Sequence, residues 1–148
     1  MRLRGLAPVA VLLFAAAGCG ADEVAGPPGS GGADEATETT VAGPDLSDVE
    51  FADETGAATV EVDAVDNDFR EDYIEIDPGT TIRFRNDGRN VHNILPVQPG
   101  SMPEVPTEAF EPGAEAELTF DEPAEIAFYC SLHGTTTKGM VGGVRVVG

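Results

Sequence analysis

From residue 58 to the C-terminus, apolar and polar side chains alternate with a period of two, and this pattern limits the possible folds more than any other feature. Residues 59–65 read Thr-Val-Glu-Val-Asp-Ala-Val, and residues 114–120 alternate in the same way. Successive side chains of a β-strand point to opposite faces, so this period predicts strands with one buried face. The helical period of 3.6 is absent from this part of the sequence.

Clusters of Pro, Gly, Asn and Asp separate the alternating segments. Residues 77–79, 86–88 and 111–113 are such clusters, and each one predicts a turn between two strands. Regularly spaced short strands without helices are typical of a β-sandwich, so we predict an all-β Greek-key sandwich of seven to eight strands. The expected strands are residues 59–65, 73–76, 81–86, 91–97, 114–120, 124–130 and 139–147, with a short edge strand beginning at Phe110.

The first 19 residues have the pattern of an export signal. Arg2 and Arg4 precede an apolar stretch over residues 6–17, which is shorter than the roughly 20 residues that a membrane-spanning helix needs. The stretch ends in Ala-Ala-Gly-Cys at residues 16–19, which resembles a bacterial lipobox, although Leu is more usual at position 16. We therefore predict a lipoprotein signal peptide over residues 1–19, with lipidation of Cys19. The alternative is an ordinary signal peptide in which Cys19 is incidental.

The following segment, residues 20–57, is rich in Gly and Pro and holds ten acidic residues and no basic ones. So few apolar side chains cannot bury enough surface to offset the entropy of the chain. We predict a disordered acidic tether that holds a globular domain, residues 58–148, away from a membrane. Residues 46–54 contain Leu, Val and Phe, and the alternative for them is a short helical turn that packs on the domain.

The charge of the whole chain excludes several classes of partner. Eight Lys and Arg residues face 27 Asp and Glu residues, which gives a formal net charge of −19. Nucleic acids are bound through clustered basic side chains, so we expect no nucleic acid partner. A polybasic patch for an anionic membrane surface is also missing, so a lipid on Cys19 would be the membrane anchor.

Few side chains in this sequence can hold a soft metal ion, and most of them gather near the C-terminus. Cys130 is followed by His133 and then by Met140, while His92 lies in an earlier predicted strand. These residues supply one thiolate, two imidazoles and one thioether. A trigonal His-His-Cys plane with a weak axial Met is the geometry of electron-transfer copper sites, so this donor set suits copper.

Several rival roles for these residues fit the sequence less well. Zinc has little use for a thioether ligand. A catalytic pair of Cys130 with a histidine lacks any accompanying oxyanion or substrate motif. A binuclear copper centre needs a second cysteine beside Cys130, and an adhesive sandwich without metal gives no reason for the four residues to occur together. Cys130 as an inert buried thiol is a further alternative.

With this donor set identified, the segment 58–148 resembles the cupredoxins, and within them the plastocyanin-like small blue (type 1) copper proteins. The resemblance rests on Gly79-Thr80 before the strand 82–86, on His92-Asn93, and on the segment Tyr-Cys-Ser-Leu-His at residues 129–133 followed by Met140. It implies one copper ion that alternates between Cu(I) and Cu(II). The implied ligands are His92, Cys130 and His133 in the plane and Met140 on the axis, with Asn93 and Ser131 bracing the site by hydrogen bonds.

One departure concerns the loop between the last two of these ligands. Residues 134–138 make it longer than in plastocyanin itself, which leaves the Met140 bond length and the redox potential open. We expect His133 to be the point where electrons leave, with Leu132, Gly134 and Met102 around it.

The resulting hypothesis is an electron carrier, not an enzyme. The protein would be a monomer outside the cytoplasm, lipid-anchored to a bacterial membrane. It would exchange single electrons with redox proteins such as a cytochrome, an oxidase or a reductase, and its acidic surface would suit a basic partner. The alternative is a copper-binding or copper-buffering lipoprotein with no electron-transfer role.

Overall fold

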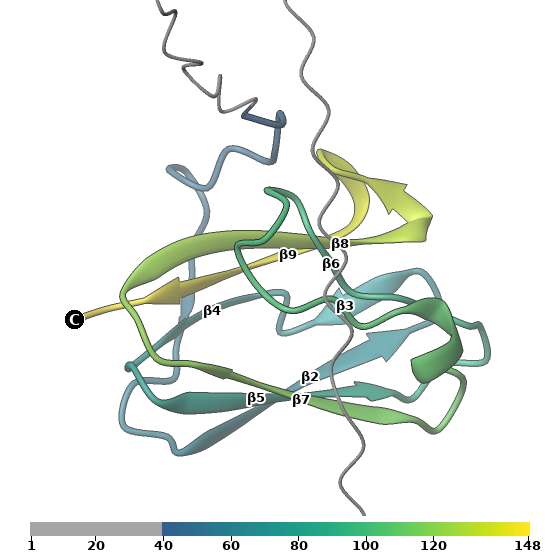
Figure 1. Ribbon diagram of the computed structural model, residues 1–148, viewed down its shortest axis with the longest axis horizontal. Helices are drawn as coiled ribbons and strands as arrows, with labels where there is room; N and C mark the ends of the chain where they lie inside the picture. The colour runs from purple at the N-terminus through teal and green to yellow at the C-terminus, as the bar shows by residue number, and fades with distance from the viewer. Residues whose placement is uncertain (1–39) are drawn as a thin grey trace, which may run out of the picture. The chain divides into compact units, whose positions relative to one another are not determined.

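The computed structural model describes residues 40–148, and in this region nine strands form two facing sheets. One sheet has the order β1-β4-β9-β8-β6 and the other has the order β3-β2-β5-β7. Figure 1 shows β2, β5 and β7 in one layer and β4, β9 and β8 in the other. The strands are β1 (Ala52–Asp53), β2 (Thr59–Val65), β3 (Asp68–Arg70), β4 (Tyr73–Ile76), β5 (Thr80–Asn86), β6 (Leu95–Pro96), β7 (Glu115–Phe120), β8 (Ala124–Thr135) and β9 (Lys138–Val146).

The prediction of an all-β sandwich is confirmed, and the sheets are mixed. Strand β2 pairs in parallel with β5, and β4 pairs in parallel with β9, so chain segments far apart in sequence become neighbours. The alternation of the sequence is preserved in three dimensions, because every second residue of β5 is buried. The register places Val62 of β2 beside Phe84 of β5, and both side chains enter the core.

Aromatic rings fill the space between the sheets. Phe128 of β8 makes edge contacts with Phe69 at 5.0 Å and with Phe84 at 5.4 Å between ring centroids. Such edge-to-face contacts add stability beyond the area that the rings bury. A Cβ atom on Gly142 of β9 would lie 2.4 Å from the Phe128 ring, so glycine at this position makes room for the ring.

Three strand predictions differ from the structure, and two short strands were not predicted. The segment expected to be a strand over residues 91–97 divides its pairing between two partners, because Ile94 bridges to Val105 while β6 pairs with β8. Phe110 follows a short 3-10 helix, η1 (Thr107–Ala109), instead of beginning a strand. Strands β1 and β3 have two and three residues, too few for an alternating pattern to stand out. Strand β8 continues past Cys130 as far as Thr135.

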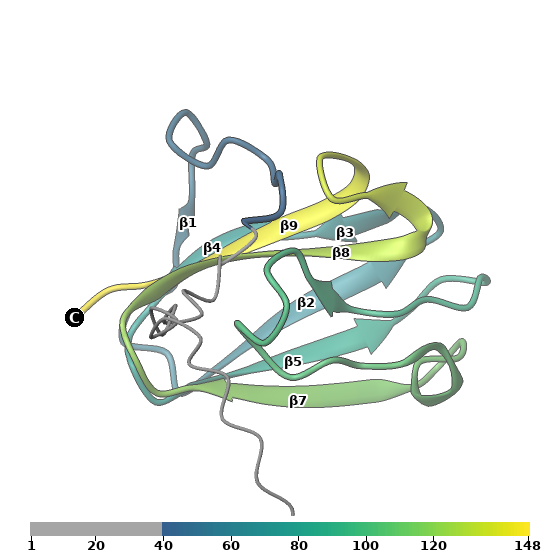
Figure 2. The ribbon, with the colours of Figure 1, turned by 45° about the horizontal axis from the view of Figure 1, so that its top comes forward.

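Residues 40–57, which we call the N-terminal arm, pack on the domain, although the sequence predicted a disordered tether here. Leu46 is only 8% exposed, and the ring of Phe51 contacts the edge of Tyr73 at 5.9 Å. Part of the arm forms β1, which pairs with β4. Between residues 46 and 54 there is one hydrogen-bonded turn, in which the N–H of Val49 donates to the carbonyl of Leu46 over 3.4 Å. Figure 2 shows the arm above the layer that contains β4 and β9.

The signal peptide predicted over residues 1–19, with Cys19, and the remainder of the predicted tether lie outside the described residues. Among the residues that the structure does describe, no helix is long and apolar enough to cross a membrane.

Candidate metal centre

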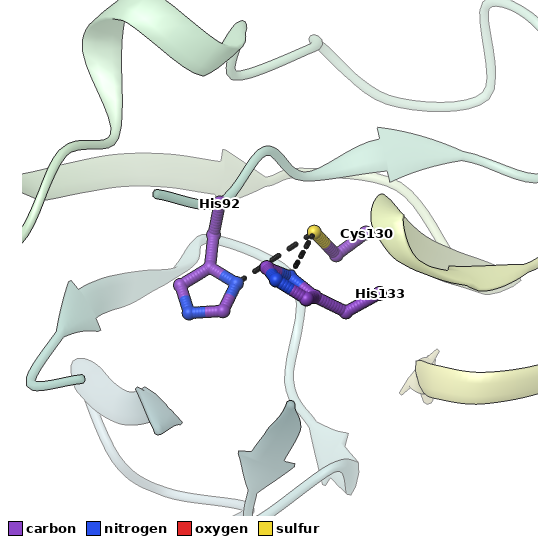
Figure 3. A group of neighbouring side chains, drawn as sticks. All are labelled: His92, Cys130 and His133. Carbon is purple, nitrogen blue, oxygen red and sulfur yellow. Dashed lines mark hydrogen bonds between the residues drawn. The ribbon is translucent and has the colours of Figure 1, made fainter. Parts of the chain in front are cut away.

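Three potential metal ligands predicted from the sequence come together at one end of the sandwich. The Sγ atom of Cys130 lies 3.7 Å from Nδ1 of His92 and 3.5 Å from Nδ1 of His133. One ligand atom from each residue lies within 4.8 Å of those of the other two. Figure 3 shows both imidazole rings with a nitrogen turned toward the sulfur. This convergence is what the sequence predicted for these three residues.

A break in the pairing of β8 with β9 brings Cys130 and His133 to the same point. The ladder pairs Tyr129 with Val141 and next pairs Gly134 with Gly139. Between these pairs, residues 130–133 of β8 stand opposite Met140 alone. A bulge of this kind bends its strand and redirects side chains, so two residues of one strand can face the same site.

Met140 is fully buried and belongs to the hydrophobic core. It occupies the position of β9 that faces the bulge, so the backbone places it opposite the segment that holds Cys130 and His133. Its role as the axial ligand stays a prediction.

The extra residues between His133 and Met140 form a β-hairpin. Thr135 pairs with Lys138, and Thr136 and Thr137 make the turn. The lengthened segment that the sequence indicated is therefore an ordered extension of β8 and β9.

His92 reaches the site from the loop between β5 and β6, which is held by backbone and amide hydrogen bonds. The His92 N–H donates to the carbonyl of Phe110 over 3.2 Å. Asn86, at the end of β5, is 1% exposed and donates from Nδ2 to that same carbonyl and to the carbonyl of Asn90, each over 2.9 Å. This role of Asn86 was not predicted from the sequence, and the signal for it was the Asn-Asp-Gly turn in which the strand ends.

Asn93 and Ser131 also meet, as the sequence predicted. Nδ2 of Asn93 donates to Oγ of Ser131 over 2.9 Å, and the backbone N–H of Ser131 donates to Oδ1 of Asn93 over 2.9 Å. Thr107 of η1 was missed, and its Oγ1 accepts from Nδ2 of Asn93 over 3.4 Å. These bonds join the residue after His92 to the residue after Cys130.

The two histidines sit in different surroundings. His92 is fully buried, while His133 is partly exposed. Burial lowers the pKa of His92, and the neighbouring His133 lowers it further. The Nε2 atom of His92 is buried without a hydrogen-bond partner among the described residues. Because the neutral imidazole is the form that binds a metal, this environment favours a ligand role.

The surface around His133 includes the exposed Leu132, whereas Met102, which was also expected there, lies elsewhere. Leu132 is 51% exposed and Val91 is 37% exposed, so apolar side chains do reach solvent near the histidines. Met102, expected beside the site, lines a cavity of about 340 Å³ together with Phe120 and Ile126. Phe120 pairs with Thr80 at the start of β5, whereas the site lies beyond the end of β5. Met102 therefore packs at the opposite end of the sandwich.

The donor atoms agree with a copper ion better than with a hard cation. Two imidazole nitrogens and one cysteine sulfur converge, and the grouping contains no carboxylate. Soft thiolate and imidazole ligands suit copper, whereas magnesium and calcium take oxygen ligands.

Comparison with known proteins also indicates a copper site. Residues 56–147 match the family model described as copper binding proteins of the plastocyanin/azurin family. This match confirms copper as the cofactor and the predicted resemblance to cupredoxins.

Two solved structures with TM-scores of 0.50 and 0.52 show the same fold. A purple cupredoxin from Nitrosopumilus maritimus shares 23% identity, with 59% of this chain and 98% of that chain covered and a TM-score of 0.50. A variant of amicyanin in the reduced state shares 20% identity, with 64% and 87% covered and a TM-score of 0.52. A copper-containing nitrite reductase from Thermus scotoductus SA-01 shares 24% identity over 61% of this chain, with a TM-score of 0.48, and only 22% of that longer chain is covered.

Proposed function

The chain belongs to the plastocyanin/azurin family of copper-binding proteins, and on this premise we propose that it carries single electrons between redox proteins. The observation that carries the proposal is the convergence of the Cys130 sulfur with Nδ1 of His92 and of His133. In this proposal these three residues would hold one copper ion, with Met140 as a fourth, weaker ligand. The bound ion would supply a one-electron couple between Cu(I) and Cu(II).

The polypeptide's part in this function is to hold the ligands still. His92 is fixed through its own backbone and through Asn86, and Cys130 and His133 lie within a bulge that is paired on both sides. Ligands that do not move when the charge of the ion changes keep the reorganisation small, which favours rapid electron transfer.

His133 is the proposed exit for electrons. It is partly exposed, whereas His92 and Cys130 are fully buried. The exposed Leu132 and Val91 give a partner an apolar surface against which to dock. No enzymatic step is part of this proposal, since a carrier needs only the metal site and a docking surface.

Copper buffering is the rival function, and reversible redox cycling separates the two. The copper-loaded protein is cycled with ascorbate and ferricyanide in the presence of a Cu(I) chelator, and the copper left in the protein is measured after each cycle. A carrier keeps its copper and returns to the same spectrum after every oxidation. Tight retention of the copper without a return to the oxidised spectrum would favour buffering and overturn the proposal.

We also propose that the protein is a monomer held outside the cytoplasm by a lipid on Cys19. The support is the sequence pattern of residues 1–19 and the acidic, Gly- and Pro-rich segment that follows it. Expression with an alkyne-labelled fatty acid, followed by membrane fractionation, tests the anchor. Label and membrane association should disappear in Cys19→Ala, and equal membrane association of the variant would refute the anchor.

A further inference from the structure

The hairpin that joins β8 to β9 is pinched where Gly134 faces Gly139, and we call this pair the neck. Gly139 has a φ of +84°, and a Cβ atom there would lie 2.7 Å from the carbonyl oxygen of His133. The same atom would lie 2.9 Å from Cα of Gly134. Real Cβ atoms do not approach backbone atoms so closely, and backbone cannot move aside as a long side chain can. The neck therefore accepts only glycine at residue 139.

Gly134 of β8 also leaves no room for a side chain, because the backbone of β9 lies too close to it. A Cβ atom at this residue would lie 2.8 Å from the nitrogen of Met140, 2.9 Å from the oxygen of Lys138 and 3.1 Å from the oxygen of Met140. The two glycines thus allow the backbones of the two strands to approach closely, and a side chain at either position would collide with the backbone of His133 or of Met140. These are the two candidate ligands that the hairpin connects.

From this geometry we infer that Gly134 and Gly139 are positioning residues that fix His133 and Met140 relative to each other. The inference rests on the proposed function, because it takes both residues as copper ligands. The neck closes the bulge on one side, and the pair Tyr129–Val141 closes it on the other. The ligand segment is therefore held between two paired positions.

The tip of the hairpin, residues 135–138, lies outside this enclosure. It pairs only with itself, through Thr135 and Lys138, and its side chains are exposed apart from the partly buried Thr136. The added length between His133 and Met140 consequently does not loosen the site. We expect the tip to tolerate substitution, whereas the neck does not.

The test compares Gly139→Ala with Gly100→Ala in the full chain. Gly100 has a φ of +83° and no atom within 4 Å of the position that a Cβ would take, so its variant carries the same backbone strain without the contact. In the copper-free protein, the amide resonances of His133 and Met140 should shift, and their hydrogen exchange should accelerate at least tenfold, in Gly139→Ala alone. After copper loading, the ratio of Cu(I) to Cu(II) affinity should change at least tenfold, which is about 59 mV for a one-electron couple.

Two further variants keep the inference testable if Gly139→Ala fails to fold. Gly134 has no positive φ, so Gly134→Ala introduces only the contacts with Met140 and Lys138, and it should give the same shifts. Replacing the tip residues 135–138 by Asn-Gly while keeping both glycines should leave the spectrum unchanged and the affinity ratio within twofold.

The opposite results would overturn the inference. The first is that Gly139→Ala and Gly100→Ala give the same amide shifts, exchange rates and affinity ratio. The second is that shortening the tip changes the ratio of Cu(I) to Cu(II) affinity tenfold. A wild-type protein that binds no copper would refute the proposed function instead, and the resonances and exchange rates of the copper-free variants would still decide whether the neck positions His133 and Met140.

Discussion

Asn93 and Ser131 bind each other through two hydrogen bonds of 2.9 Å, one between their side chains and one from the backbone of Ser131 to the side chain of Asn93. They are 38 residues apart in sequence, and each directly follows a candidate ligand. The pair therefore ties the loop that holds His92 to the strand that holds Cys130. Asn93 is 6% exposed, so its side chain is largely shielded from water.

Asn93→Ala should destabilise the copper-free protein more than Ser131→Ala does. The Asn93 variant loses both bonds to Ser131 and the 3.4 Å bond to Thr107, and each lost bond costs about 0.5–1.5 kcal/mol. The Ser131 variant keeps the bond from its backbone to Asn93, and a single lost bond costs about 0.5–1.5 kcal/mol. Urea denaturation with unchanged m-values measures both. A larger loss in Ser131→Ala would contradict the assigned pairing.

The N-terminal arm is the subject of a second prediction, because one arginine links it to the sheet. The guanidinium carbon of Arg145 lies 3.9 Å from the centroid of the Phe51 ring, and the side chain also pairs with Glu75 and Glu125. Arg145→Ala should release the arm and accelerate exchange of the Glu54 amide, which donates to the carbonyl of Glu75. Hydrogen exchange followed by mass spectrometry of residues 40–57 measures this effect.

Arg83 is the matched control for Arg145. It lies in the other sheet, pairs with Glu61 and Glu117, and has a side-chain exposure of 36% against 32% for Arg145. Exposed ion pairs contribute about 0–1 kcal/mol each, so both variants should lose similar ion-pair energy. The cation–π contact adds about 0.5–1 kcal/mol for Arg145 only. Equal exchange of the arm in both variants would show that Arg145 does not hold it.

Asp72 gives a prediction about pH. Its partial burial raises the pKa of this carboxyl above the usual value, and the charge of Asp68 raises it further. The folded state then binds a proton more readily than the unfolded state does, so stability falls as the pH rises from about 4, the ordinary pKa of Asp, through the raised value.

Asp72→Asn removes this loss, so the variant should gain stability over the wild type at pH 7 and gain less at pH 3. Thermal unfolding at the two pH values measures the difference. Asp68→Asn should act in the same direction with a smaller effect, because it removes only the second cause. A variant of Asp72 whose advantage is greater at pH 3 would contradict the assignment.

The sequence predicted most of the sandwich because alternation survives wherever one face of a strand is buried. Strands β2, β5 and β7 agree with the predicted segments to within one residue. The candidate ligands could also be predicted, since few residues in the chain can bind a soft metal and Cys130 and His133 are close in sequence. The chemistry of the side chains carried this prediction without any knowledge of their distances.

What could not be predicted depends on contacts between distant segments. The arm has the composition of a disordered segment, and only the surface around Tyr73 and Gly143 gives Leu46 and Phe51 a place to pack. The bulge opposite Met140 is likewise a property of two paired strands. Thr107 contributes through its position in η1 beside Asn93, which no local pattern indicates.

The most direct test of the central claim is the visible spectrum of the full-length protein after addition of Cu(II). We predict an intense thiolate-to-copper band that is lost in Cys130→Ser and kept in Cys19→Ser, the other cysteine of the chain serving as the matched control. A wild-type protein that stays colourless and binds no copper, or a band that survives in Cys130→Ser, would contradict it.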